Sequence, residues 1–435
     1  MAVASLRDEA VELLQALIRL DTVNPPGNET VAAVLLRDYL AENGIEAELY
    51  AREPGRDNLV ARIPGRGDGP RLALLSHTDT VLADPAEWIL DPWSGELVDE
   101  EVWGRGALDM KGQVAATAVA LASLAREGFR PNGDLIFVAA ADEEVGIDVG
   151  MQWLAREHPD AVRAEYVLNE GGGDRVVFGG RPLYLCSVAE KMSAPFRLLV
   201  RGRSGHASMP GIADNALVKA SRLIPRLGEY VPARRHGPET EPLTRLLLGD
   251  VPEPEETLER LAEIHPLARA LVEPLLSLTL SPTMIAASQK RNVIPAVCEV
   301  TVDCRLLPGV TPDDVEPVIR TALGPADYDL RWIEAVGGTR SPADTPLWDV
   351  VAGFVAEIEP EAETVPIGSA GFTDSHWMRQ AFGSVAYGFF PMRTMDPEVA
   401  ALLVHSANER VHVADLELGV DFLRHAAQAV GAMTK

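Results

Sequence analysis

Histidine and carboxylate residues follow apolar runs in this chain, and these residue types bind divalent metal ions. His77 and Asp79 come after the run 72–75, which has the length of a buried strand. Asp109 stands thirty-two residues after His77 and precedes a helical pattern. In open α/β sheets, ligands bind at the edge where strands give way to helices, and zinc accepts imidazole and carboxylate ligands. The stretch favours a metal site, although a chance His-x-Asp and a glycine-rich turn would also explain it.

Two adjacent acids add to this pattern. Glu143 and Glu144 directly follow the predicted strand 134–140. Side chains of successive extended residues point to opposite sides, so one glutamate can bind metal while the other faces a substrate. A solvated acidic turn is the ordinary explanation of an isolated Glu-Glu pair.

Two more residues complete the set. Glu170 ends a predicted strand and precedes three glycines, where backbone can approach a ligand closely. His405 lies in a polar loop. Alone, the first is explained as a helix cap and the second as a surface histidine. Five such residues at corresponding strand ends, however, predict two metal ions that share a bridging carboxylate.

The elements around these residues indicate an α/β fold with an inserted domain. Over 1–188, strands alternate with helices, which is typical of a sheet covered on both faces. Over 189–341, the order strand-helix-strand-strand-helix-strand predicts a split βαβ domain, with a Pro- and Glu-rich insertion at 229–280. Residues 342–435 resume the helical pattern, and a strand at 384–390 returns to the first domain.

Composition excludes several classes of partner. The net charge is −26, which repels nucleic acid and anionic membrane surfaces, so neither is expected to bind. The three cysteines fit no zinc-finger spacing and are expected to be buried thiols in a reducing compartment. The first residues lack the basic start and apolar core of a signal peptide, and no apolar run has the length of a membrane span. We therefore expect a cytoplasmic protein.

Nine short stretches, taken in order, resemble a known family. They are SHTDTV, GRGALDMKG, DEEVG, LNEGGG, GRSGHASMP, RNVIPA, DCRLLPG, GFTDS and HSANE, and the resemblance covers nearly the whole chain. The family is that of the co-catalytic zinc metallopeptidases and amidohydrolases, which includes aminoacylase, acetylornithine deacetylase, succinyl-diaminopimelate desuccinylase, glutamate carboxypeptidase and carboxypeptidase S. The resemblance implies a zinc-peptidase-like α/β catalytic domain, with a mixed sheet covered by helices, and an inserted ferredoxin-like α+β lid or dimerisation domain.

The resemblance also implies two divalent metal ions per chain. Zn²⁺ is the first expectation, with Co²⁺ or Mn²⁺ as alternatives. Asp109 would bridge the two ions. His77 and Glu170 would complete one metal site, and Glu144 and His405 the other.

Further roles follow from the same resemblance. Asp79 would orient the neighbouring histidine ligand, Glu143 would be the general base, and His206 would stabilise the oxyanion, from the same chain or from the partner in a homodimer. A substrate carboxylate would be held by residues of the inserted domain and of a later loop: Asn292, Arg305 and Gly371. The larger insertion puts the usual dimer interface in question, and GFTDS departs from the family's Gly-Gly-Thr-Asp type loop.

The sequence therefore predicts a dizinc hydrolase. Its expected substrates are N-acyl amino acids or small peptides with a free carboxylate, cleaved at an amide or peptide bond. A dipeptidase, or a deacetylase or desuccinylase of one biosynthetic intermediate, is the alternative within this class. Outside it stand a non-catalytic binder of carboxylated ligands and a two-metal phosphoesterase. Glu143 argues against the binder, because a pure binder needs no base.

Overall fold

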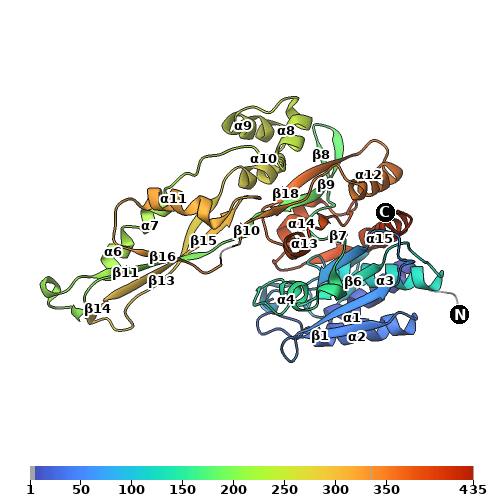
Figure 1. The fold of residues 1–435 in the computed structure, drawn as a ribbon, viewed down its shortest axis with the longest axis horizontal. Helices are drawn as coiled ribbons and strands as arrows, with labels where there is room; N and C mark the ends of the chain where they lie inside the picture. Colours follow the sequence, from blue (N-terminus) through green and yellow to red (C-terminus); the bar gives the residue numbers. More distant parts are fainter. Residues whose placement is uncertain (1–4, 335, 435) are drawn as a thin grey trace. The chain divides into compact units, whose positions relative to one another are not determined.

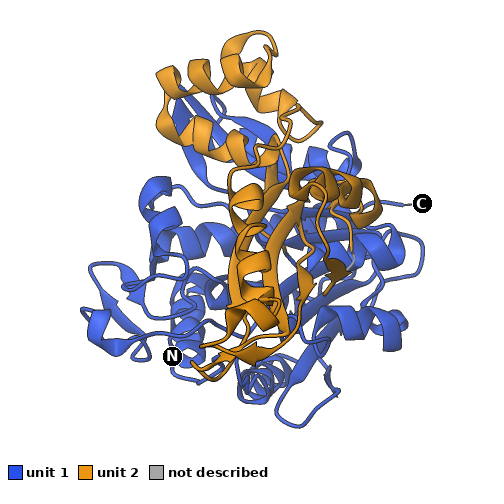
Figure 2. Ribbon diagram, turned by 90° about the vertical axis from the view of Figure 1, so that its left-hand side faces the viewer, with its two compact units in different colours: residues 1–188, 341–367, 373–435 blue, residues 189–340, 368–372 orange. Residues whose placement is uncertain are grey.

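The computed structural model describes residues 5–334 and 336–434, and the chain divides into two compact units. Figure 2 colours them separately. Unit 1 contains the chain up to Val188, Ser341–Ile367 and the chain from Thr373; unit 2 contains Ala189–Arg340 and the short segment Gly368–Phe372. This short segment lies within 342–435, the range predicted to return to the first domain.

A mixed sheet forms the centre of unit 1 (Figure 1). Eight of its strands lie side by side in the order β1 (Ala47–Ala51), β2 (Asp57–Ile63), β6 (Leu135–Ala140), β3 (Leu72–His77), β7 (Tyr166–Asn169), β19 (Val385–Gly388), β9 (Arg181–Glu190) and β17 (Thr339–Arg340). Two further strands, β8 (Arg175–Phe178) and β18 (Glu363–Ser369), also pair with β9. The four strands β6, β3, β7 and β19 are parallel neighbours, so their carboxyl ends meet at one edge. Strands β6 and β3 are buried at every residue, as expected for parallel strands with both faces covered.

Helices cover both faces of this sheet. On one face, residues of β6 pack with Met151, Leu154 and Met378 of the helices α4 (Met151–Glu157) and α13 (Ser375–Phe382). On the other lie α1 (Leu6–Ile18), α2 (Thr30–Glu42), α3 (Lys111–Arg126) and α15 (Val413–Gly431), with α12 (Pro346–Ile358) against α15. Helix α3 is rich in alanine and buried over almost its whole length, since helices flank it on both sides. The predicted α/β class with a helix-covered mixed sheet is confirmed.

Two local predictions in unit 1 were wrong. The strand predicted to end at Glu170 ends one residue earlier, at Asn169. Asp109 was predicted to lie at a strand end of the same sheet, but the strand before it, β5 (Glu101–Trp103), belongs to a separate three-stranded sheet with β4 (Glu96–Val98) and β20 (Arg410–His412). Strand β9 was missed, although its continuous apolar run within RPLYLCSVAE is also consistent with a buried strand.

Unit 2 is built on an antiparallel sheet. Strands β13 (Thr279–Ala286), β15 (Val297–Leu306), β11 (Phe196–Arg201) and β16 (Asp329–Trp332) lie in that order, and β10 (Met192–Ser193) pairs with the end of β15. Alternate residues of β15 are buried, and this face packs against α6 (Ala216–Ser221), α7 (Ile224–Gly228) and α11 (Pro312–Leu323). This is the predicted ferredoxin-like layout. The 229–280 insertion carries the helices α8 (Glu241–Leu248), α9 (Pro254–Ile264) and α10 (Pro266–Val272).

Two further expectations concern the cysteines and membrane-spanning helices. Cys186, Cys298 and Cys304 are free and buried. In the described ranges, no helix combines the length and the apolar character needed to cross a membrane.

Candidate metal centre

Three of the candidate ligands follow the parallel strands of unit 1. His77 is the last residue of β3, Glu144 lies in the turn after β6, and Glu170 directly follows β7. Because these strands are parallel neighbours, the three side chains meet at one edge of the sheet. Glu143 and Glu144 were predicted to be extended residues, and this prediction was wrong. Both lie in a turn that begins after Asp142, which has a left-handed φ of 70°.

The other two candidate ligands come from loops. Asp109 lies in the turn between β5 and helix α3, two residues before the helix begins, and His405 follows α14 (Pro397–Leu403). Their expected placement at strand ends of the main sheet was therefore wrong. His405 has a left-handed φ of 59°.

Asp109 stands between the two histidines. Its Oδ1 lies 3.0 Å from Nε2 of His77, and its Oδ2 lies 3.0 Å from Nε2 of His405. On the His405 side, Oε2 of Glu144 lies 3.2 Å from the same imidazole nitrogen. On the His77 side, Oε1 of Glu170 lies 3.7 Å from Nε2. One carboxylate thus faces two separate sets of ligands, which is the arrangement that a bridging ligand requires.

The potential ligand atoms converge closely enough to hold cations. Two groups have all their ligand atoms within 4.8 Å of one another: His77, Asp109 and Glu144 form one group, and His77, Glu143 and Glu170 the other. Glu143 places Oε2 4.0 Å from Nε2 of His77. Oε1 of Glu144 is buried and has no hydrogen-bond partner among the residues that the structure describes.

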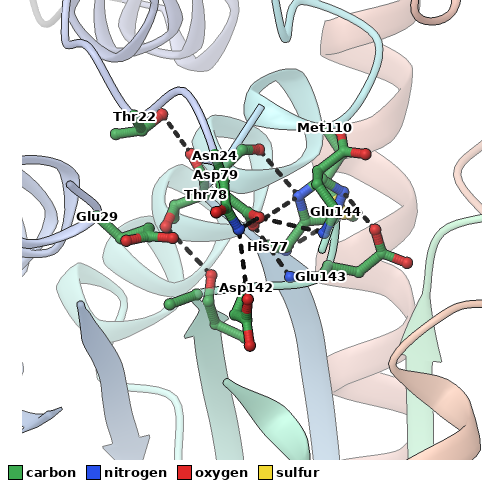
Figure 3. A network of polar contacts seen from close by, with 12 residues as sticks. Thr22, Asn24, Glu29, His77, Thr78, Asp79, Met110, Asp142, Glu143 and Glu144 are labelled. Carbon is green, nitrogen blue, oxygen red and sulfur yellow. Dashed lines mark hydrogen bonds and ion pairs between the residues drawn. The ribbon is translucent and has the colours of Figure 1, made fainter. Parts of the chain in front are cut away.

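Asp79 contacts both His77 and the turn that carries Glu143 and Glu144 (Figure 3). It is fully buried, and its Oδ1 accepts the backbone N–H of Glu143 at 3.2 Å and lies 3.4 Å from Nδ1 of His77. Its Oδ2 accepts the backbone N–H of Glu144 at 3.1 Å, and its carbonyl oxygen lies 3.1 Å from Nδ1 of His77. One residue therefore fixes a histidine and the turn that carries both glutamates.

The site concentrates negative charge in a buried place. Burial raises the pKa of Glu143 well above its usual range, and the charge of Glu170 raises it further. Hydrogen bonds to Asp109 and Glu144 raise the pKa of His405 to about 10. Burial lowers the pKa of His77, but the charge of Glu170 and the contacts with Asp109 and Asp79 outweigh this effect and raise that pKa well above its usual value. In the described part of the chain, neither Lys nor Arg pairs with these four carboxylates. Bound cations would supply the missing positive charge.

Comparison with known proteins agrees with this geometry. The model of peptidase family M20/M25/M40 matches residues 73–429. The chain belongs to this family. It is accordingly a hydrolase of peptide or amide bonds.

Relatives of this M20 hydrolase are similar over most of their length. The N-fatty-acyl-amino acid synthase/hydrolase PM20D1 of Xenopus tropicalis is 27% identical, over 80% of this chain and 70% of that protein. Succinyl-diaminopimelate desuccinylase of Cereibacter sphaeroides is 27% identical, over 94% of this chain and 95% of that protein. Among solved structures, an M20 family metallo-carboxypeptidase from Sulfolobus solfataricus has a TM-score of 0.75 at 18% identity, over 98% of this chain and 100% of that one. This last likeness shows the fold.

The remaining candidate residues of the M20 hydrolase lie in unit 2. His206 is exposed on β12 (Gly205–His206), which pairs with β14 (Val293–Ile294), and the carbonyl of Asn292 accepts the N–H of Ala207 at 3.0 Å. His206 and Asn292 are therefore neighbours. Nδ1 of His206 lies 2.7 Å from Oγ of Ser208.

Arg305 and Gly371 lie elsewhere in this unit. Asn292 and Arg305 do not lie on paired strands: β14, which follows Asn292, pairs with β12, whereas β15, which carries Arg305, pairs with β10, β11 and β13. Nε of Arg305 donates to Oδ1 of Asp303 at 3.1 Å. This ion pair is an alternative to a substrate carboxylate as the partner of Arg305. Gly371 is exposed and donates its N–H to Oγ of Ser369 at 3.1 Å.

Two buried acids next to the site were not predicted as site residues. Glu409, in HSANE, accepts the N–H groups of Leu108 at 2.8 Å and Asp109 at 3.0 Å, and it pairs with buried Arg105 at 2.6 Å. It thereby holds the loop that presents Asp109. Asp374, in GFTDS, is buried, burial raises its pKa well above the usual range, and its Oδ2 has no hydrogen-bond partner in the described ranges. Both acids lie in motifs already singled out in the sequence, HSANE and GFTDS, and these motifs could have indicated them.

Proposed function

We propose that the chain binds two divalent metal ions in unit 1 and hydrolyses the amide bond of N-acyl amino acids, or of small peptides with a free carboxylate. One observation carries the proposal. The two oxygens of Asp109 face the Nε2 atoms of two different histidines, each at 3.0 Å. A carboxylate placed in this way can bridge two ions, as two-metal hydrolytic sites require.

The donor set fits zinc. It consists of two imidazoles and three carboxylates, and imidazole and carboxylate are ligands of zinc; Co²⁺ and Mn²⁺ are the alternatives. His77 and Glu170 complete the site on one side of Asp109, and Glu144 and His405 complete it on the other. The unpartnered Oε1 of Glu144 supports this assignment, because a buried carboxylate oxygen is usually satisfied by a donor or a cation.

The side chains around this centre divide the work of hydrolysis. When bound, the ions polarise a carbonyl oxygen and lower the pKa of water. Glu143 takes the proton of the attacking water and delivers it to the leaving nitrogen. Its burial supports the role, since a carboxyl group with a raised pKa can be protonated during turnover. Asp79 holds the His77 ring and the backbone of Glu143 in place.

Residues of unit 2 recognise the substrate in this proposal. His206 stabilises the oxyanion, in the same chain or across a homodimer, and unit 2 serves as the lid or dimerisation domain. The substrate carboxylate is held by Asn292, Arg305 and Gly371. The names of the curated relatives support an N-acyl amino acid as substrate. A cytoplasmic location also stays a prediction.

A substrate panel tests the proposal. Purified enzyme loaded with Zn²⁺ should cleave N-acyl amino acids or dipeptides and leave a phosphate monoester intact, and Glu143→Gln should lower the rate of cleavage about 10²–10⁴-fold. Phosphate-ester hydrolysis without amide cleavage would favour a phosphoesterase. Tight binding of acyl amino acids without turnover would favour the non-catalytic binder.

A further inference from the structure

A buried segment between α1 and α2 runs beside the residues that follow β3. Oγ1 of Thr22 donates to the carbonyl of Thr78 at 2.7 Å, and the N–H of Thr80 donates to the carbonyl of Thr22 at 3.1 Å. The N–H of Asn24 donates in turn to the carbonyl of Thr80 at 2.9 Å. These bonds fix the backbone of Asn24 next to Asp79. The side chain of Asn24 is 3% exposed, so it must find its partners inside the protein.

The amide of Asn24 lies between two buried carboxylates (Figure 3). Its Nδ2 is 2.9 Å from Oδ2 of Asp79 and 3.4 Å from Oδ1 of Asp142. A primary amide carries two N–H donors, so one group can serve both acids. No other type of neutral side chain of this length offers two donors from a single atom. The position therefore needs asparagine for its chemistry as well as for its size.

Both acids hold the turn that carries Glu143 and Glu144. Asp79 accepts the backbone N–H groups of these two glutamates, as described above. Asp142, with its left-handed φ of 70°, precedes them and accepts the N–H of Val149 at 3.1 Å. A non-glycine residue with such a φ is retained when surrounding contacts determine it. Asn24 is thus the side chain that joins the two anchors of the turn.

A buried ion pair supports the second anchor. Arg56 donates to both carboxylate oxygens of Glu29, at 2.5 and 2.7 Å, and its Nη2 lies 3.5 Å from Oδ1 of Asp142. The side chains of Arg56 and Glu29 are 5% and 0% exposed. The arginine partly offsets the charge of Asp142. Asp79 accepts no bond from a Lys or Arg in the described ranges, and besides His77 its side-chain donor is Asn24.

We propose that Asn24 is a positioning residue of the reaction: through Asp79 and Asp142 it sets the turn that presents the base Glu143 and the metal ligand Glu144. This inference rests on the proposed function for the roles of the two glutamates. Its structural part, that Asn24 organises the metal centre, can be tested without any substrate.

The variants Asn24→Ala and Asn24→Asp, made in the full chain, test the proposal. The first removes both donors, and the second keeps the shape but places a third carboxylate beside the other two. The affinity of the metal-free protein for Zn²⁺, measured by competition with a chromophoric chelator, should fall several-fold, with the loss of about 10–100-fold for a direct partner of a metal ligand as the upper bound. With the best substrate, kcat should fall over a similar range while KM changes little.

Asn132→Ala is the matched control. Asn132 also belongs to unit 1, and its Nδ2 donates two bonds, at 3.1 Å each, to the carbonyls of Ala432 and Met433. It precedes β6, whereas Glu143 and Glu144 follow the other end of that strand. This variant should lose thermal stability and keep wild-type zinc affinity and kcat. If Asn24→Ala does not fold, Asn24→Asp decides the matter, and a melting profile identifies which variants are folded.

Two outcomes would overturn the proposal. One is wild-type zinc affinity and kcat in a folded Asn24 variant. The other is a loss of affinity and kcat in Asn132→Ala as large as in the Asn24 variants, which would reduce the effect to general destabilisation. An enzyme that cleaves no amide in any form would defeat the proposed function instead, while the difference in zinc affinity between wild type and the Asn24 variants would still stand.

Discussion

Exchanging each of the adjacent glutamates for glutamine separates the base from the ligand. Glu143→Gln keeps the length of the side chain and the backbone N–H bond to Asp79. Loss of a general base typically lowers kcat about 10²–10⁴-fold, which corresponds to about 2.7–5.4 kcal/mol of barrier. Because burial raises the pKa of Glu143, its charge is unfavourable in the metal-free protein. A neutral glutamine should therefore leave the stability of that form unchanged or improved.

Glu144→Gln should give the opposite pattern. Its Oε2 lies 3.2 Å from Nε2 of His405, and its Oε1 has no partner in the described chain, so the carboxylate is placed to bind a cation. Loss of a ligand should weaken metal binding at least as much as loss of an outer partner, about 10–100-fold. Its activity should return, in part, at high metal concentration, whereas that of Glu143→Gln should not.

The assay combines metal content after dialysis with kcat at increasing Zn²⁺. The expected result is two ions and low kcat for Glu143→Gln, and a lowered metal content with metal-dependent recovery for Glu144→Gln. If Glu143→Gln loses its metal while Glu144→Gln retains it, the assignment of the pair is reversed. If both retain metal and activity, the turn after β6 takes no part in the chemistry.

Four further predictions follow from named contacts. Asp109→Ala should lower metal content on both sides of the centre, because both histidines face this carboxylate; elemental analysis that still finds two ions would remove it from the bridging role. Glu409→Ala should cost about 3–5 kcal/mol in urea unfolding, since it leaves buried Arg105 unpaired, and a loss of about 1 kcal/mol or less, as for a surface pair, would contradict this. His405 has a pKa of about 10 in the metal-free protein, so it is protonated at pH 7 and must release its proton to bind metal. Zinc affinity should therefore rise with pH from 6 to 8. Calorimetry in buffers of different ionisation enthalpy should show that zinc binding releases protons, and His405→Ala should reduce the number released. Arg305→Ala should erase a preference for substrates with a free carboxylate over their amides, and Arg305→Lys should not restore it, because a point charge lacks the bidentate fork; equal cleavage of acid and amide by the wild-type enzyme would sink this role.

The site could be predicted largely because its residues occur in ordered motifs. The strands β3, β6 and β7 were predictable from buried apolar runs, and parallel pairing then brings their ends together. The local geometry was less accessible. Asp142 takes a left-handed φ, in which aspartate is one of the enriched non-glycine residues. A single aspartate is too common to identify a turn, so the sequence did not show that Glu143 and Glu144 lie in one.

Contacts between distant segments account for most of what was missed. Asn24 meets Asp79 across fifty-five residues, and Glu409 meets Asp109 across three hundred. These residues become neighbours only when the chain folds, so a single sequence does not show that they are in contact. The helices of the 229–280 insertion were different, since a signal existed: α9 and α10 begin at Pro254 and Pro266, and proline is favoured in the first turn of a helix.

Anomalous X-ray scattering at the zinc edge, from crystals of the zinc-loaded protein, would locate the bound ions. We expect two peaks in unit 1, about 3.5–4 Å apart as in other two-metal sites. One oxygen of Asp109 should face each peak, with His77 and Glu170 at the first and Glu144 and His405 at the second. A single peak, or a pair of peaks that Asp109 does not bridge, would contradict the proposed two-metal centre.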